Sequence, residues 1–440
     1  MFIATKLLTM GARNAAKNWR HSLAAVLSVA AGFATLTVFE NYFKKAGDIY
    51  QQTYSRRYML GDIMFEKHGA QDASLFDQHT ASLSRADQTM IAGLLEHSND
   101  KIDVAVRFLT VTGSVTNGTS NTVAVGFGHD IANGTTARGK AWAWNVNAGV
   151  PLVSEDRPVV LLGKIMGRGL GCTFDAKATS FTVVGNYPAI ERPFNCPETL
   201  SLAATTDSGQ ANAITVRIAG ISDAGFQEMD ARQVVMPLKV AQSLLATDRI
   251  SYLSVTLKDP TERAALVAKW QRDLADQGAS IDVMDWRKHP FGDLYVRSME
   301  YLDLFRGFIM AVIIVIAAMS TFNILSKNVT ERTRDVGTMR SIGFRSRQIV
   351  LLFGFEGVAL AAIGIALGGI SAFVTTLAVN LIGIPYRAGI FSEPIPFLVS
   401  LNPGPYAVFS LFMGIVAATA AVAAAWQVSR VAIPEALAHI

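Results

Sequence analysis

Few residues of this 440-residue chain have the types and spacing that chemistry requires. Gly163 and Lys164 are followed by Ile165, whereas a phosphate-binding loop has serine or threonine there to hold Mg²⁺. The glycines of residues 163–171 lack the spacing of a dinucleotide-binding turn. The seven histidines show no i, i+3 or i, i+4 pairs, and no serine lies in a nucleophile elbow. The sequence therefore predicts no catalytic residue, no metal site and no bound cofactor.

An arginine-rich segment at residues 326–348, between two apolar segments, indicates a binding role instead. Its arginines are Arg332, Arg334, Arg340, Arg345 and Arg347. Arginine beside a membrane span is typical of the cytoplasmic side. On a helix, Val329, Val336 and Met339 would share one side. We therefore expect a short amphipathic helix against the cytoplasmic face, although a loop that only fixes topology would have the same charge pattern.

Two polar side chains fall inside predicted spans. Glu356 is the ionisable group that lies well inside an apolar segment, and such carboxylates are functional candidates. Pairing with a nearby arginine is the favoured interpretation, because Glu356 lies only one or two turns into its span. Asn323, near the inner end of the preceding span, is expected to make an interhelical hydrogen bond rather than to contact a substrate.

The two cysteines, Cys172 and Cys196, both fall in the segment expected outside the membrane. An oxidising compartment would let them form a disulfide. Two unlinked core cysteines remain the alternative, because spacing alone does not determine geometry.

Composition and hydropathy place these residues in a membrane protein. Half of the chain is hydrophobic, 17% is charged and the mean hydropathy is +0.30, which indicates a few spans and a large water-facing domain. Four apolar segments have the length of a span. They lie at residues 21–43, 305–325, 349–384 and 406–426. The net charge is +4, and the basic residues concentrate next to these apolar segments. Membrane topology explains this distribution better than nucleic-acid binding does.

The segments that flank the spans complete the predicted topology. Residues 1–20 carry a basic stripe typical of a helix on phospholipid headgroups, and a signal peptide is the alternative. Residues 385–405 form a proline-rich external loop. The tail at 427–440 is internal, so both termini are expected in the cytoplasm.

Residues 44–300 contain no span and alternate short strands with helices. The β-branched segments predict strands. They are Val104–Val111, Thr122–Val125, Val159–Leu162, Phe181–Val184, Ile214–Ile218 and Leu253–Leu257. A helix should begin at Pro260, capped by Asp259 with Glu262 completing a capping box, and end at Gly278. The expected fold is a membrane α-helical chain with four transmembrane helices and a large α+β extracytoplasmic domain between the first and second.

One sequence segment, ERTRDVGTMRSIGFRSRQI, is followed by an apolar segment that contains Glu356. Together they resemble the signature of the FtsX and MacB superfamily of ABC transporter permeases. In that family this segment docks onto a separate ATPase, with apolar side chains such as Val336 and Met339 entering a groove on it. The resemblance implies these coupling residues: Glu331, Arg332, Arg334, Val336, Met339, Arg340 and Gly343. The external segment VRIAGISDAGFQEMDARQVVMPLKVAQSLL is also similar to the corresponding segment of lipoprotein-releasing permeases of the LolC/LolE type.

The resemblance implies a type VII permease in a bacterial inner membrane, with a MacB-like periplasmic domain. Two permease protomers, identical or different, would assemble with an ATPase dimer that holds ATP and Mg²⁺, and a periplasmic chaperone or adaptor could join them. No ATPase domain is expected on this chain. The expected function is extraction of a lipidated or amphiphilic substrate that enters sideways from the outer leaflet, between the first and third spans of the two protomers. The glycines of the third span are expected to allow close helix packing and to leave room for this entry. The alternatives are a MacB-like driver of an efflux pump and an FtsX-like scaffold that activates a cell-wall hydrolase.

Overall fold

The computed structural model separates into two compact units, each of which is discontinuous in sequence. The helical unit comprises Met1–Gly47, Glu300–Ile384 and Phe397–Ile440, and the α+β domain comprises Asp48–Met299 and Pro385–Pro396. The structure describes residues 19–72, 81–142, 146–174, 194–224, 227–386 and 395–430. Most of the expected N-terminal helix and of the expected C-terminal tail lies outside these residues, as does the predicted strand Phe181–Val184.

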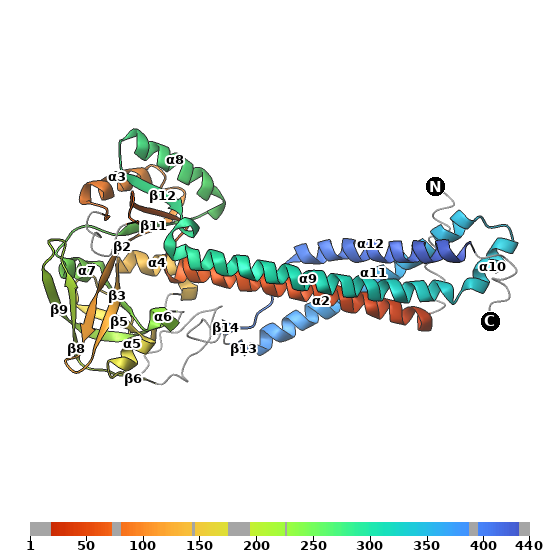
Figure 1. The fold of residues 1–440 in the computed structure, drawn as a ribbon, viewed down its shortest axis with the longest axis horizontal. Helices are drawn as coiled ribbons and strands as arrows, with labels where there is room; N and C mark the ends of the chain where they lie inside the picture. Colours follow the sequence, from red (N-terminus) through yellow and green to blue (C-terminus); the bar gives the residue numbers. More distant parts are fainter. Residues whose placement is uncertain are drawn as a thin grey trace. The chain divides into compact units, whose positions relative to one another are not determined.

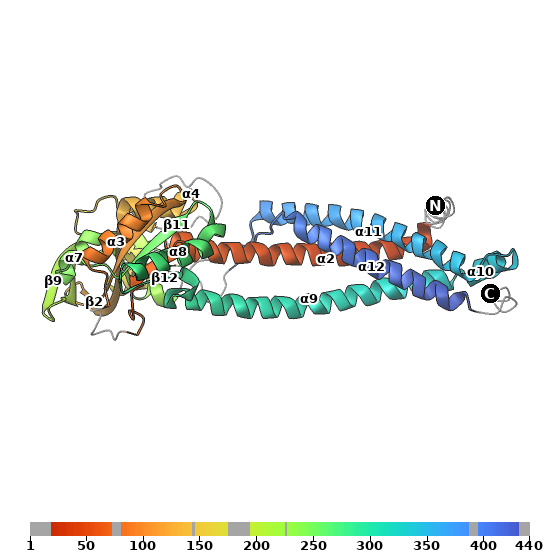
Figure 2. The same cartoon turned by 90° about the horizontal axis from the view of Figure 1, so that it is seen from above.

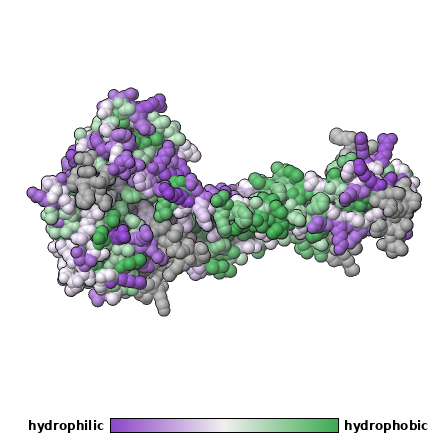
Figure 3. Space-filling model, viewed as in Figure 1, coloured by the Kyte–Doolittle hydropathy of each residue, from purple (hydrophilic) through white to green (hydrophobic). Residues whose placement is uncertain are grey.

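In the part of the chain that the structure describes, four helices are long and apolar enough to cross a membrane, which confirms the four predicted spans. They are α2 (Trp19–Gln52), α9 (Pro290–Thr330), α11 (Ser346–Ile382) and α12 (Pro403–Val428). Figure 3 shows hydrophobic residues gathered over these helices. The short helix α10 (Thr333–Ser341) lies between α9 and α11 in the chain (Figure 1).

Glycines of α11 set the packing of the helical unit. A Cβ atom on Gly357 would lie 2.5 Å from the Cβ of Ala421 in α12, and one on Gly368 would lie 2.6 Å from the carbonyl oxygen of Ala30 in α2. Gly364 also faces α2. Only residues without a side chain allow such close backbone approach, so α11 packs tightly against both α2 and α12, and Figure 2 shows the course of these helices.

The first lobe of the α+β domain is a four-stranded antiparallel sheet of ferredoxin-like topology. Its chain order is β1 (Ile63–Lys67), α3 (Arg85–Glu96), β2 (Ile102–Thr116), β11 (Tyr252–Leu257), α8 (Arg263–Asp276) and β12 (Ile281–Asp285). The strands are ordered β12-β1-β11-β2, so each half contributes a strand, a helix and a strand that interleave with those of the other half.

The second lobe lies between β2 and β11 in sequence and closes into a ring of six strands, β2-β3-β10-β5-β9-β8. The strands added to β2 are β3 (Asn121–His129), β5 (Val159–Gly163), β8 (Thr199–Thr205), β9 (Ala211–Ser222) and β10 (Gln233–Pro237). The ring closes because β8 pairs with both β2 and β9. Strand β4 (Val146–Gly149) extends it beside β9.

Short helices and strand pairs complete this lobe. The helices are α4 (Ile131–Trp142), α5 (Lys164–Gly169), α6 (Gln227–Asp230) and α7 (Leu238–Leu245). Helix α7 packs on β2, β3, β8 and β9 through its apolar face. The small strand pairs are β6 (Thr173–Phe174) with β7 (Phe194–Asn195), and β13 (Pro385–Tyr386) with β14 (Ile395–Pro396).

Five of the predicted strand segments lie within β2, β3, β5, β9 and β11, which confirms them. The predicted helix is also present, preceded by a 3₁₀ turn in which Asp259 Oδ1 accepts a hydrogen bond from Thr261 N at 2.9 Å. Gly278 ends it at φ +68°. The expected capping box is wrong, because the Glu262 carboxylate instead pairs with Lys101 at 2.9 Å.

A cluster of aromatic rings joins the ends of α2 and α9 to the sheet. Helix α2 continues into a π-helical turn, η1 (Thr53–Arg57). There Tyr54 stacks on Trp286 at 5.7 Å between ring centroids, and Tyr295 of α9 lies 4.9 Å from Trp286. The chain therefore enters and leaves the segment Asp48–Met299 of the α+β domain at one packed cluster.

The structure pairs Cys172 with Cys196 in a disulfide, as predicted from their shared compartment. The bond ties the turn after α5 to the residues after β7.

We expect both cysteines to resist alkylation in protein purified without reductant and denatured before labelling. Replacing both with serine should lower the stability of the α+β domain by about 3 kcal/mol, because the bond closes a loop of this size in the unfolded chain. Thermal unfolding of the full chain would measure the loss. Two reactive thiols in the oxidised protein would contradict the pairing.

Candidate functional site

Helix α10 is held in a sharp connection between two spans. Helix α9 ends at Thr330, and the Thr333 hydroxyl donates to the Thr330 carbonyl at 2.5 Å as α10 begins. Gly343, at φ +104°, lets the chain turn back after α10, because this left-handed conformation favours glycine. Gln348 Oε1 then accepts from Arg345 N at 2.9 Å, which caps α11. The expected helix over Glu331–Gly343 is thus shorter, at Thr333–Ser341.

A buried ion pair fixes α10 to α11. Arg332 Nη1 donates to both carboxylate oxygens of Glu356, at 2.7 and 2.9 Å, and the Glu356 side chain is only 8% exposed. The same guanidinium contacts Asp335 at 3.2 Å and lies over the Phe353 ring at 5.1 Å. This pairing agrees with the favoured interpretation of Glu356, whose charge is compensated by the arginine in front of α10.

The apolar face of α10 is enclosed by its own chain. Val336 is 0% exposed and packs in a cluster with residues of α9, α11 and α12. The other buried members are Val329, Ile349, Phe353, Ala424, Ala425 and Val428. Met339 is half-buried against the same cluster. The expectation that Val336 enters a groove on a partner is therefore wrong. Periodicity identified the apolar face correctly, but not the helices that cover it.

The opposite face of α10 and the turn after it is exposed and basic. Ile342 is 73% exposed, beside exposed Arg334, Thr338 and Arg345. Glu331 and Gly343 are also exposed, and Arg340 is half-buried. Figure 3 shows hydrophilic residues at this end of the helical unit. Sequence reasoning missed Ile342, although an isoleucine next to a helix-ending glycine among arginines is a usable signal.

Other polar groups within the spans differ from expectation. Asn323 is exposed on α9 and makes no hydrogen bond to the described residues, so the expected interhelical bond is not formed within this chain. Asn41 of α2 was missed. Its side chain is 0% exposed and has no hydrogen-bond partner in the described part of the chain. Asn380 of α11 exchanges two 2.9 Å bonds with the Val399 backbone. Glu356 and Asn323 are therefore not the only strongly polar side chains in the spans.

The glycine-rich side of α11 packs closely against neighbouring helices, as expected for glycines in a span. The same side was also expected to leave an apolar entry for a substrate. Gly364 and Gly368 instead face α2, and Gly357 faces α12, so this chain fills that side itself.

Comparison with known proteins gives a family match for the C-terminal part of the chain. Residues 307–433, which include α10 and the Arg332–Glu356 pair, match the FtsX-like permease C-terminal family. This part is an FtsX-like permease domain. The chain is 26% identical over 155 residues to the macrolide export ATP-binding/permease protein MacB of Rhodospirillum rubrum, covering 35% of this chain and 24% of that protein. It is 27% identical over 188 residues to the uncharacterised ABC transporter permease YvrN of Bacillus subtilis, covering 41% and 43%.

The matched segments thus span about a quarter of the MacB relative and less than half of YvrN. Two solved structures are similar at 14% identity and a TM-score of 0.32. One is the extracellular domain of the transporter YknZ from Gram-positive bacteria, covering 51% of this chain and 99% of that one. The other is the periplasmic region of MacB from Actinobacillus actinomycetemcomitans, covering 54% and 92%.

Replacing Glu356 with glutamine should leave Arg332 with only the exposed Asp335 carboxylate as a counter-charge and remove its buried one. We expect a loss of about 3 to 5 kcal/mol in the stability of the helical unit, the usual cost of removing one partner of a buried pair. Thermal unfolding of the purified full chain would show it. Glu300→Gln, at an exposed position of α9, is the matched control. Equal unfolding temperatures for the two variants would show that the pair does not hold α10.

Proposed function

We propose that this chain is the permease subunit of an ABC transporter, and that the exposed face of α10 and its following turn binds a separate cytoplasmic ATPase dimer carrying ATP and Mg²⁺. The observation that carries the proposal is the rigid mounting of α10. Its apolar face is buried, Arg332 is paired with Glu356, and only the basic face with Ile342 is left for a partner. An anchor of this kind, an aliphatic side chain surrounded by arginines, suits a groove with an acidic rim.

The mounting also supports a way to transmit motion. A displacement of α10 would reach α11 through the ion pair and α2 and α12 through the close glycine contacts, because packed helices move as bodies rather than deform. The chain passes between the helical unit and the α+β domain through α2 and α9. ATP-driven closure of the partner would therefore be converted into movement of the α+β domain.

The proposed location is a bacterial inner membrane, with α10 and both termini in the cytoplasm and the α+β domain outside. Support comes from the basic residues around α10 and from the disulfide, which suits an oxidising compartment. A second permease protomer would complete the assembly. Helix α9 supports this, because its apolar surface is the least covered of the four spans, with 17% of it buried in this chain.

For the substrate we propose an amphiphile taken up from the outer leaflet. The support is that the helical unit is largely apolar and that the buried Glu356 carboxylate is paired with Arg332. Few charged groups therefore remain that could bind a hydrophilic solute. Lipoprotein release is one form of this proposal. Export of a small amphiphile through an adaptor-linked pump is the second candidate, and the names of the MacB relatives favour it.

Replacing Ile342 with aspartate should weaken ATPase binding at least tenfold, because it places a charge at the centre of the contact without touching the buried face of α10. Copurification of the ATPase subunit with the tagged chain, and its ATPase rate in the complex, would measure the loss. Val153→Asp changes an equally exposed aliphatic side chain, 77% exposed, in the α+β domain and should have no effect. Undiminished copurification of Ile342→Asp would contradict docking at this face.

The topology is tested by cysteines placed at Ser208 and Ser346, both exposed in the structure. The native cysteines are bonded and give no background. In intact cells whose outer membrane is permeabilised, an impermeant maleimide should label the Ser208→Cys variant and spare the Ser346→Cys variant until the inner membrane is opened. Labelling at position 346 in sealed cells would overturn the orientation.

A further inference from the structure

The α+β domain contains a cavity of about 280 Å³ beside the points where the chain enters and leaves it. Its wall includes Tyr54 of η1, Phe127 of β3, Leu161 of β5 and Tyr252 of β11, and the first turn of α9 closes one side. Two of the α9 residues that line it, Phe291 and Leu294, are also exposed, so the cavity opens beside α9.

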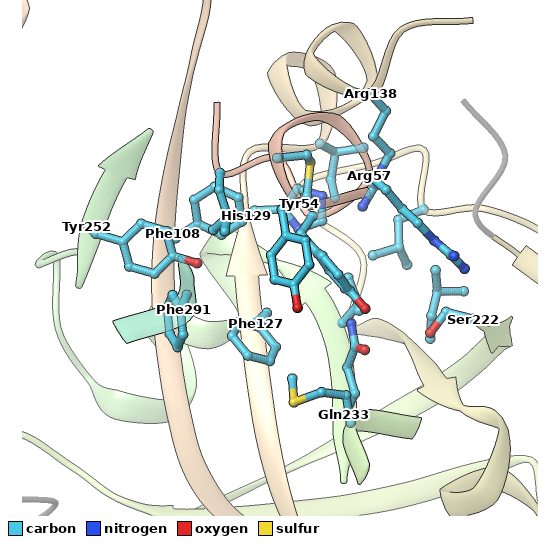
Figure 4. A pocket seen from close by; sticks show the side chains of 18 of the residues that line it. Tyr54, Arg57, Phe108, Phe127, His129, Arg138, Ser222, Gln233, Tyr252 and Phe291 are labelled. Carbon is cyan, nitrogen blue, oxygen red and sulfur yellow. The ribbon is translucent and has the colours of Figure 1, made fainter. Parts of the chain in front are cut away.

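One end of the cavity is aromatic. Tyr252 stacks on Phe108 at 4.8 Å between ring centroids, and Phe291 lies edge-on to Tyr252 at 5.6 Å and to Phe127 at 6.3 Å. Figure 4 shows these rings on the same side of the pocket. Flat rings around a narrow space are a suitable wall for an acyl chain or a small ring system.

The other end carries arginines that differ in their partners. Figure 4 shows Arg57 and Arg138 together on the side opposite Tyr252. Arg57 forms an ion pair with Asp223 at 2.5 Å and donates to the Asp223 carbonyl at 2.8 Å. Arg138 makes no ion pair or hydrogen bond with any described residue; the residue is half-buried, and its Nε atom is fully buried. Burial, followed by the like charge of Arg57, lowers the pKa of Arg138 to about 10, so it remains a cation at neutral pH.

Two further polar groups of the cavity lack partners. His129 is 1% exposed, and neither ring nitrogen has a hydrogen-bond partner in the described ranges. Burial lowers the pKa of His129 well below its usual value, with Arg138 acting in the same direction and the Phe127 backbone weakly in the other. The ring is therefore neutral. Gln233 is also buried, and its side-chain oxygen has no partner among those residues.

Unpaired buried polar groups are costly, and a cation is the most costly of them. A structural role would not account for their grouping, because Arg138, His129 and Gln233 come from three separate elements and all line one cavity. A ligand with an acidic head would supply the missing counter-charge, and its apolar part would lie against the rings. The volume is near the lower end of the ~300 to 1,000 Å³ usual for ligand pockets, which suits one chain rather than a two-chain lipid.

We propose that this cavity binds a single-chain anionic amphiphile, with its acidic head at Arg138 and its apolar chain between the aromatic rings. The proposal does not depend on the docking role of α10. Because the cavity is walled by η1 and the first turn of α9, a bound ligand would hold these two chain connections in one arrangement.

The test uses the full chain in phosphatidylcholine nanodiscs and a dodecanoate analogue that carries a diazirine. Irradiation should label peptides that contain Phe127, Tyr252 or Phe291. Free dodecanoate should compete, dodecanol of the same length should compete at least tenfold less well, and inorganic phosphate should not compete. Labelling confined to α11, α12 or the part of α9 that follows Leu294, equal competition by dodecanol, or protection by phosphate alone would each overturn the proposal.

The charge is tested by Arg138→Gln, which should reduce cavity labelling about tenfold or more, whereas Arg138→Lys should retain most of it. Arg217→Gln makes the same change at an exposed position of β9 and should label like the wild type. Without ligand, Arg138→Gln should unfold at the wild-type temperature or higher, because it removes an unpaired charge. Full labelling of a folded Arg138→Gln variant would contradict recognition of an acidic head. If that variant does not fold, the comparison of dodecanoate with dodecanol on the wild-type chain decides the question.

Discussion

A charged side chain in apolar surroundings needs a counter-charge, and this constraint determines how α10 is mounted. Glu356 lies in a helix that is otherwise apolar, and Arg332 reaches it from the turn before α10. The pair holds the start of α10 against α11, and the cluster around Val336 holds the rest. Among the described residues of α10 and its following turn, the exposed basic face with Ile342 is therefore the surface that a partner could contact.

The hydropathy pattern was sufficient to predict the four long helices and the division into a helical unit and an α+β domain. Strands rich in β-branched residues were also predictable, because their local composition differs from that of the helices. The closed ring of strands was not, since the pairing of β8 with both β2 and β9 joins residues far apart in sequence. Local pattern contains no information about which distant strand completes a sheet.

The errors at the candidate site share one physical cause. Val336 was assigned to a groove on a partner, and the α11 glycines to a substrate entry in addition to close helix packing, whereas the chain itself fills both spaces. A sequence shows which face of a helix carries apolar side chains or glycines. It does not show which part of this chain or of another molecule packs against that face.

Strand β2 belongs to both lobes of the α+β domain. Its first half pairs with β11 in the ferredoxin-like sheet, and its second half pairs with β3 and β8 in the ring. Bending the lobes apart would have to distort the middle of β2, where Phe108 is paired with both Tyr252 and His129, so the strand joins the lobes more firmly than a loop would. The domain should therefore behave mechanically as a stiff lever, in which a small rotation at η1 produces its largest displacement at the strands farthest from it.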